Sequence, residues 1–255
     1  MELRNRILIL SIAVAVLLII GIHLFHYLPD DTYITLRYAR NVLRGDGFVF
    51  NEGERLEGYT NFLWLLIIVL LGKLGGSLLS LARTLSFVFS AGTLLLSGYA
   101  ARGTLPRQPP CGWNDALSVM LPPMVLAASA PFLTWSLSGT EIPLFTFLLL
   151  LGFILLRNGK RPGAVFAVFG LLGLVRPEGL IFYALAGLIL LARSRRKADV
   201  LLGGGGILAL FYVPYLIWKL YYFGALLPNT FYAKTGPFAL MLRNGSKYLL
   251  GFLAC

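Results

Sequence analysis

Apolar residues form long, nearly unbroken runs along this chain, and polar residues gather in the short intervals between them. A helix needs about 20 residues to cross a hydrocarbon core of about 30 Å, and several runs approach or exceed that length. The pattern therefore predicts an all-α, polytopic transmembrane helix bundle. The runs lie near 7–28, 62–72, 78–101, 116–133, 141–156, 162–175, 178–192 and 200–223.

Composition and charge support this class of protein. Of the 255 residues, 58% are hydrophobic and 13% charged, whereas a soluble domain is about 45–50% apolar and about 25% charged. The net charge is +11, but most basic residues outside 28–61 sit in short clusters between apolar runs, as in cytoplasmic loops that face anionic lipid. We therefore expect membrane lipid, and no nucleic acid, as a partner. The clusters are Arg4/Arg6, Arg102/Arg107, Arg157/Lys160/Arg161 and Arg193/Arg195/Arg196/Lys197.

The basic clusters also predict an orientation in the cell (inner or plasma) membrane. The run 7–28 is too long for a cleaved signal peptide, so we expect an uncleaved first helix with its N-terminus in the cytoplasm. With the clusters at 157–161 and 193–197 inside, the polar motifs at 138–141, 176–178 and 229–234 lie outside.

Whether the run 62–72 crosses the membrane determines on which side the residues after it lie. Its roughly 11 residues span roughly 16 Å as a helix, too short to cross alone, so we expect a partial or re-entrant helix. The following run, 78–101, then crosses inward and places Arg102 and Arg107 in the cytoplasm. A tilted helix over 62–82 is the alternative, and it would leave both arginines outside.

Acidic residues concentrate on the predicted outer side. Residues 28–61 hold six of the eleven carboxylates, and Glu141 and Glu178 in two other outer motifs raise the number to eight. Acidic residues have little influence on topology, so insertion does not explain this one-sidedness. Ionisable groups at a membrane usually mark a site. We therefore expect the outer motifs to form one site.

Asp30 and Asp31 follow Pro29 directly after the first apolar run. Two interpretations of this pair are open. One aspartate could be a general base, since adjacent like charges raise the proton affinity of one partner. Alternatively, the pair caps the following helix, where acidic side chains bind free N–H groups and suit the dipole.

Residues 32–44 are predicted to form an amphipathic helix in the first outer loop. At 100° per residue, Arg37, Arg40 and Arg44 fall within about 60° of one another, and apolar residues occupy the opposite side. Such a helix is expected to lie in the membrane interface. Its arginines bind either lipid headgroups in general or one specific lipid phosphate.

The remaining candidates carry open alternatives of their own. Glu57 is either a site carboxylate or a solvated charge near the bilayer. Arg176 and Glu178 form either a local ion pair in a helix hairpin or part of an active site. Lys234 either binds substrate or extends along apolar surface to water.

Three later motifs and one long stretch carry a family resemblance. Residues 30–64 read DDTYITLRYARNVLRGDGFVFNEGERLEGYTNFLW. This stretch resembles the first extracytoplasmic loop of the GT-C superfamily of polyprenyl-phosphate-dependent glycosyltransferases. Within the superfamily, the similar branch includes mycobacterial terminal arabinofuranosyltransferases. Three later segments of this chain also resemble recurring motifs of that branch, in the same order: WSLSGTEIPLF, RPEG and LPNTFYAK. Members are usually about twice this long or more.

The length of the chain indicates which part of such a protein it represents. The sequence stops seven residues into a further apolar segment, 248–254, which is too short to cross a bilayer. We expect residues 1–255 to be the N-terminal transmembrane catalytic module of such a glycosyltransferase, with 29–61 as its first extracytoplasmic loop.

The resemblance implies transfer of a sugar, such as arabinofuranose, from a polyprenyl-phosphate donor. The acceptor would be a hydroxyl of a cell-envelope glycan, lipid or protein on the extracytoplasmic side. By position, Asp30 matches the family's leading acidic residue and would be the base. Asp31 would support it or help hold a divalent cation, which some members use and others do not.

The chemistry agrees with a general-base, inverting-type mechanism. Phosphate leaves as a stable anion, so no general acid is needed, unlike glycoside hydrolysis. Transfer requires a base on the acceptor and cations at the phosphate. The substrate-binding candidates are Arg37, Arg40, Arg176 and Lys234 as phosphate cations, Glu57 and Glu141 for sugar hydroxyls or the acceptor, and Tyr59, Glu178 and Asn229 from the same motifs.

Two other functions are kept open. A transporter or flippase for a lipid or solute would place polar groups at mid-membrane and on both faces, whereas the acidic residues here are one-sided. A non-catalytic or truncated family member would share the motifs without the activity.

Overall fold

The computed structural model describes residue 5 and residues 12–13, 15–17, 19–20, 28–103, 113–159, 161–234 and 238–253. Within these ranges the regular structure is entirely helical, as predicted. The helices are α2 (Asp30–Arg44), α3 (Phe62–Gly72), α4 (Leu78–Arg102), α5 (Trp113–Ala128), α6 (Ala130–Ser136), α7 (Ile142–Asn158), α8 (Pro162–Val175), α9 (Gly179–Arg193), α10 (Lys197–Phe223), α11 (Asn229–Lys234) and α12 (Phe238–Leu253).

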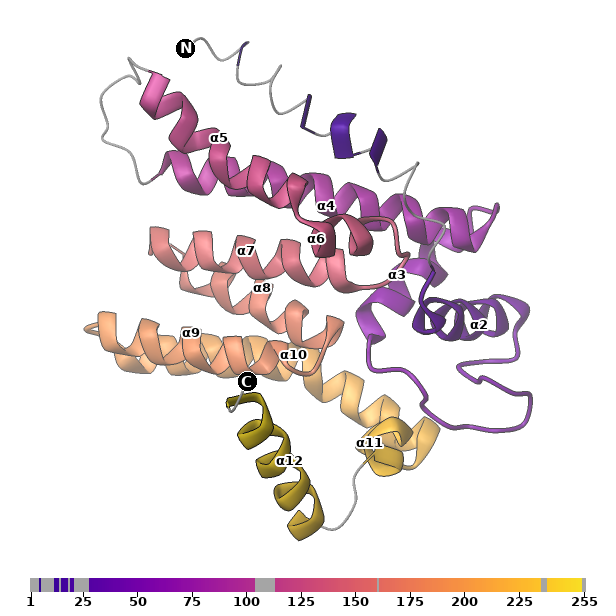
Figure 1. Ribbon diagram of the computed structural model, residues 1–255. Coiled ribbons are helices and arrows are strands. Elements are labelled where there is room, and N and C mark those ends of the chain that lie inside the picture. The colour runs from indigo at the N-terminus through magenta and orange to yellow at the C-terminus, as the bar shows by residue number, and fades with distance from the viewer. Residues whose placement is uncertain are drawn as a thin grey trace.

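The longer helices form a bundle, and the short polar elements gather at one of its ends. Figure 1 shows α4, α5, α7, α8, α9 and α10 running side by side, with α2, α3 and α11 at one end. The α7–α8 and α9–α10 turns lie at the opposite end (Figure 1). There Arg157 donates to the carbonyl of Ala100 and Arg193 to that of Leu156. The described basic residues of these two turns thus lie at the end of the bundle opposite the acidic motifs.

Length and composition identify candidate membrane spans. Among the described residues, α4 and α10 are long and apolar enough to cross a membrane. A third candidate arises if α5 from Leu117 and α6 count as one span, bent by 70°. Helices α3, α7, α8 and α9 are apolar but shorter. The number of crossings and their direction remain predictions.

The short run 62–72 forms a helix of its own. Helix α3 ends at Gly72, and the turn to α4 contains Gly75 and Gly76 at φ +89° and +94°. Helix α4 then starts with Ser77 as its N-cap, whose side chain accepts from the N–H of Ser80. A continuous helix over 62–82 is therefore wrong, since two successive left-handed residues cannot continue a right-handed helix.

The apolar run 116–133 is divided between two helices, α5 and α6. The helix is interrupted at Ser129, whose backbone is extended. Helix α6 begins at the next residue and has Pro131 in its first turn. Pro131 has no N–H to donate to the carbonyl four residues earlier, and its ring would clash with that carbonyl, so α5 cannot continue through this position. Two further prolines, Pro122 and Pro123, lie within α5.

The amphipathic helix predicted at 32–44 is confirmed as α2. Leu36, Tyr38 and Ala39 are buried, whereas Arg37 and Arg40 are exposed, as the stripe predicts. The helix stops at Gly45, whose φ of 94° is readily adopted by glycine.

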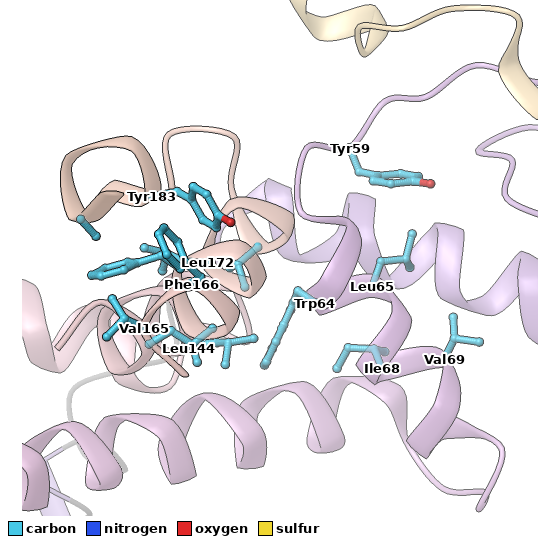
Figure 2. Close-up of a cluster of buried hydrophobic side chains, with 14 of the residues drawn as sticks. Tyr59, Trp64, Leu65, Ile68, Val69, Leu144, Val165, Phe166, Leu172 and Tyr183 are labelled. Atoms are coloured by element: carbon cyan, nitrogen blue, oxygen red, sulfur yellow. The ribbon is translucent and has the colours of Figure 1, made fainter. Parts of the chain in front are cut away.

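The core anchors α3 inside the bundle. Trp64, Leu65 and Ile68 are fully buried and belong to the same hydrophobic cluster as Phe166 and Leu172 of α8 (Figure 2). Because α3 is held by this core, the polar residues just before it are fixed relative to α7 and α8.

Candidate functional site

A polar pocket lies where four predicted outer motifs meet at one end of the bundle. Its volume is about 150 Å³. Four predicted site residues share its lining: Asp31, Tyr59, Glu141 and Arg176. The other lining residues are Ile34, Thr35, Gly58, Thr60, Asn61 and Thr230. The structure thus brings together residues more than 140 positions apart in the sequence.

Glu141 is at the centre of the pocket's hydrogen bonds. Its Oε1 lies 3.2 Å from Nη1 of Arg176, and its Oε2 accepts from Nδ2 of Asn61 at 2.9 Å. The same Nδ2 donates to Oγ1 of Thr35 at 3.0 Å. Both amide hydrogens are therefore used on one side of Asn61, which assigns its Oδ1 as an acceptor.

That acceptor has no partner among the described residues, although it is buried. A buried acceptor without a hydrogen bond costs about 1–3 kcal/mol. A ligand hydroxyl or amine that donates a hydrogen bond to this oxygen would remove that cost. Asn61 lines the pocket, so its oxygen is a candidate partner for a ligand donor.

The loop before α7 is held by three helices. Thr32 of α2 donates to the carbonyl of Ser138 at 2.8 Å. Trp64 of α3 donates to that of Gly139 at 3.2 Å, and Ser86 of α4 to that of Thr140 at 3.0 Å. Three successive carbonyls are thus fixed by side chains. This attachment explains why Glu141 is placed firmly at the start of α7.

A second, larger cavity lies on the other side of Ile34. This groove, of about 850 Å³, runs between the exposed face of α2 and the α3–α4 turn. Arg37, Arg40 and Arg44 line it together with apolar residues such as Leu43 and Leu78, and Ile34 lines both cavities. Its lining combines cations with apolar surface, the combination that a lipid phosphate requires.

Arg37 is the best fixed of these cations. Its Nε donates to the carbonyl of Phe50 at 3.0 Å, and its guanidinium lies 5.4 Å from the centre of the Phe50 ring. The loop after α2 therefore orients this side chain along the groove.

The two adjacent aspartates line different cavities. Asp30 lines the groove and Asp31 lines the pocket, and both are exposed. The N-cap of α2 is Pro29, so neither aspartate occupies that position. Asp30 Oδ1 accepts from the N–H of Asp31 at 3.0 Å, which serves one free donor of the first turn. The capping interpretation holds only in this weaker form, and the catalytic role remains a prediction.

Glu57 lines neither cavity, and its buried side chain contacts α10. Its Oε2 lies 2.6 Å from Nζ of Lys219, and its Oε1 accepts from the hydroxyl of Tyr215 at 3.2 Å. Burial raises the pKa of Glu57, and the Lys219 ammonium and the Tyr215 hydroxyl offset part of that rise. The structure gives this carboxylate protein partners on both oxygens.

Lys219 is a residue that our sequence reasoning missed. It is only 4% exposed. The signal was a single lysine near the end of the apolar run 200–223, because a charge inside such a run usually has a partner. The partner itself, Glu57, lies 162 positions away and could not be read from the pattern.

The other predicted residues fall in different surroundings. Tyr59 is buried, which raises the pKa of its hydroxyl well above the usual range and keeps it protonated. Glu178 is exposed and lies 3.5 Å from Arg176. Asn229 is exposed, and its backbone N–H donates to the carbonyl of Glu57 at 2.8 Å. The side chain of Lys234 lies outside the described residues.

Thr230 is a second missed residue. It follows Asn229 in α11 and lines the pocket. A threonine in the motif LPNTFYAK gave no signal that separates it from its neighbours.

Within the part of the chain that the structure describes, no group of three or more His, Cys, Asp or Glu side chains is arranged to hold a metal ion. In the pocket, Asp31 and Glu141 are the acidic residues, and Glu141 is already paired with Arg176. A metal role for Asp31 remains a prediction.

Comparison with known proteins identifies homologues of this chain. It is 33% identical over 243 residues to a terminal β-(1→2)-arabinofuranosyltransferase of Mycobacterium tuberculosis, covering 87% of this chain and 37% of that protein. It is 29% identical over 243 residues to the protein of the same name from Corynebacterium glutamicum, covering 84% of this chain and 34% of that protein. No family model and no solved structure matches the chain.

The chain therefore spans about a third of the length of these curated relatives. The resemblance to the arabinofuranosyltransferase branch is confirmed as homology over this part.

Proposed function

We propose that this chain carries the substrate site of a membrane glycosyltransferase. It transfers a sugar, a pentofuranose such as arabinofuranose, from a polyprenyl-phosphate donor to a hydroxyl of a cell-envelope glycan, lipid or protein. The observation that carries the proposal is the pairing of a basic groove with a polar pocket across Ile34 at one end of the bundle. Homology to arabinofuranosyltransferases supports it.

The groove suits the lipid-phosphate part of the donor. Arg37 and Arg40 present guanidinium groups that can bind phosphate oxygens in pairs, and Arg44 lies one turn further along α2. Leu43 and Leu78 provide an apolar wall for the first units of the lipid. Cations at this position stabilise the charge that develops on the phosphate as it leaves.

The pocket suits hydroxyl-rich groups. Asn61 offers its free acceptor, and Glu141 offers carboxylate oxygens held in place by Arg176. Tyr59 and Thr230 complete the lining. These groups would orient a sugar ring so that its anomeric carbon faces the acceptor.

The reaction needs one base. The acceptor oxygen attacks the anomeric carbon, the bond from that carbon to the phosphate oxygen breaks, and the acceptor proton moves to an aspartate. Asp30 is the proposed base, because by position it matches the leading acidic residue of the similar glycosyltransferases, and the adjacent Asp31, which lines the pocket, supports it. The phosphate departs as an anion and takes no proton from the protein.

The site is proposed to face the extracytoplasmic side of the cell membrane. The basic turns at the opposite end of the bundle would then face the cytoplasm, in agreement with the positive-inside rule. Glu178→Cys and Arg196→Cys test this directly, because their parent side chains are 57% and 87% exposed at opposite ends. An impermeant thiol reagent added outside should label position 178 only, and labelling of position 196 alone would invert the orientation.

The activity test uses membranes that contain the chain, supplied with a labelled polyprenyl-phosphate sugar. Wild-type membranes should transfer label to an acceptor, and Asp30→Asn should lower the rate at least about 100-fold, as loss of a general base does. Asp46→Asn, an exposed acid in the same loop, is the matched control and should keep the wild-type rate. Transfer by Asp30→Asn at the wild-type rate would overturn the assignment of the base.

A further inference from the structure

We infer that Lys219, through its ion pair with Glu57, is a positioning residue for the wall of the polar pocket. The inference rests on the proposed function and assigns a role to a side chain that touches neither cavity. It concerns the loop between α2 and α3 and its attachment to the outer end of α10.

The pair is enclosed and short. The Lys219 and Glu57 side chains are 6% and 3% exposed, and their charged atoms lie 2.6 Å apart. Tyr215, one turn earlier on α10, donates its hydroxyl to the second Glu57 oxygen. An ammonium on an apolar helix is costly unless it reaches water or a counter-charge. Here Lys219 is held away from water, so Glu57 is the group that compensates its charge.

Other contacts fasten the same loop to the same end of α10. The hydroxyl of Tyr222 accepts from the N–H of Phe48 at 2.9 Å. The Phe48 ring lies edge-on to that of Trp218 at 4.9 Å, and the Arg55 guanidinium lies 5.0 Å from the Tyr222 ring centre. The loop is therefore attached to α10 by polar, aromatic and cationic contacts, and the Glu57 ion pair is the one buried charge among them in the described residues.

Glu57 connects this attachment to the pocket. The next four residues, 58–61, all line the pocket, and they include Asn61 with its free acceptor. The Glu57 carbonyl accepts from the N–H of Asn229, which places the neighbouring Thr230 in the same lining. One residue thus fixes two stretches of pocket wall, while its side chain is held by Lys219.

The consequence is a division of roles. Lys219 is not among the residues that line the pocket, so its removal should alter the pocket only by releasing the loop. The carboxylate left behind would be buried without its cation, a state that costs several kcal/mol and favours opening. Removing both charges together, as in Lys219→Met/Glu57→Gln, should relieve that cost, because the amide oxygen that replaces the carboxylate can still accept from the Tyr215 hydroxyl.

The first readout does not depend on activity. Arg55, two residues before Glu57, is exposed, but trypsin binds an extended stretch of chain, so cleavage after Arg55 follows the population of the form in which the loop is released from α10. In solubilised full-length chain, Lys219→Met should speed this cut at least about 100-fold relative to wild type. Lys219→Met/Glu57→Gln should return the rate to within about tenfold of wild type. Lys73→Met, in the exposed α3–α4 turn, is the control and should leave it unchanged.

The second readout separates positioning from simple loss of folded protein. Loss of folded chain lowers the maximal rate and leaves KM unchanged, whereas a displaced wall raises KM for the substrate whose hydroxyls fill the pocket. Lys219→Met should raise KM at least about fivefold for the donor or the acceptor, and the double variant should recover it. Measuring both substrates shows which one the pocket holds.

The two proposals fail in different ways. Wild-type membranes that transfer no sugar would overturn the proposed function. An unchanged rate of cleavage after Arg55 in Lys219→Met would overturn the inference about Lys219. A double variant that trypsin cuts as fast as the single variant would also overturn it. An unchanged KM in Lys219→Met with an opened loop would likewise overturn the positioning role.

Discussion

Two carboxylates of this protein each pair with a cation that is distant in the sequence, yet their surroundings differ. The Glu57–Lys219 pair is closed, with side chains 3% and 6% exposed. The Glu141–Arg176 pair is open on its Arg176 side: the Glu141 side chain is 10% exposed, but Arg176 is 37% exposed and both residues line the pocket. The closed pair fastens a loop to α10, and the open pair faces a cavity that can admit a ligand.

The difference shows why an acidic residue in a polar motif does not identify a binding residue by itself. Glu57 and Glu141 both belong to motifs predicted to lie on the outer side, and both have a cationic partner. What separates them is whether solvent, and therefore substrate, can reach the pair. A closed pair acts mainly on stability, and an open pair acts mainly on binding and rate.

The largest expected effect comes from breaking the closed pair. Glu57→Ala leaves the Lys219 ammonium buried without a counter-charge, and the free energy of unfolding should fall by about 3–5 kcal/mol. Chemical unfolding in detergent micelles measures this. Glu54→Ala, an exposed acid three residues earlier, is the control and should differ from wild type by less than about 0.5 kcal/mol. Equal stability of the two variants would remove the distinction between closed and open pairs.

The open pair should show the reverse balance. Arg176→Met should lower sugar transfer at least about 100-fold, because a cation that orients Glu141 at the pocket is lost. Its free energy of unfolding should change by less than about 1 kcal/mol, since a partly exposed ion pair contributes little. Rate and unfolding are measured on the same preparation, with Arg196→Met at the opposite end as control. A variant that loses stability but keeps its rate would contradict this assignment.

A glycine before Glu141 gives a smaller effect. Gly139 has φ +74°, and an added Cβ would lie 3.0 Å from Cγ2 of Thr32. Gly139→Ala should therefore lower the free energy of unfolding by about 1–2 kcal/mol from the left-handed backbone, with the contact adding to it. Gly53→Ala is a matched control, because Gly53 has φ +84° and open space around it. If both variants lose the same stability, the contact with Thr32 has no measurable cost.

The smallest effect belongs to Glu178. Its side chain is 57% exposed and lies 3.5 Å from Arg176, which keeps its shorter contact with Glu141. Glu178→Gln should change the free energy of unfolding by less than about 0.5 kcal/mol and the transfer rate by less than about threefold. A larger loss of transfer at unchanged stability would show that Glu178 contacts the substrate, as its motif predicts.

Local patterns in the sequence predicted much of the fold. The arginine stripe of α2 and the glycine at its end are set by helical spacing and backbone freedom, so both could be read directly. The short helix α3 was recognised from its length. The break at Ser129 was missed because apolar residues continue across it, and only its prolines signalled the bend.

The candidate site was predictable as a set of motifs and not as a geometry. The motifs placed Asp31, Tyr59, Glu141 and Arg176 on one side of the bundle, and the structure places them around one pocket. That Asp30 faces a different cavity follows from the 100° step between neighbouring residues on a helix, but which cavity each meets depends on packing.

The sequence by itself determined the helical class, the amphipathic face of α2 and the separation of acidic motifs from basic turns, because each follows from residues close together in the chain. Only the tertiary structure decided that Glu57 is closed off by Lys219 while Glu141 and Arg176 stay open to a pocket. Ion pairing and burial depend on which distant helices pack together, and 162 residues separate Glu57 from the lysine that decides its role.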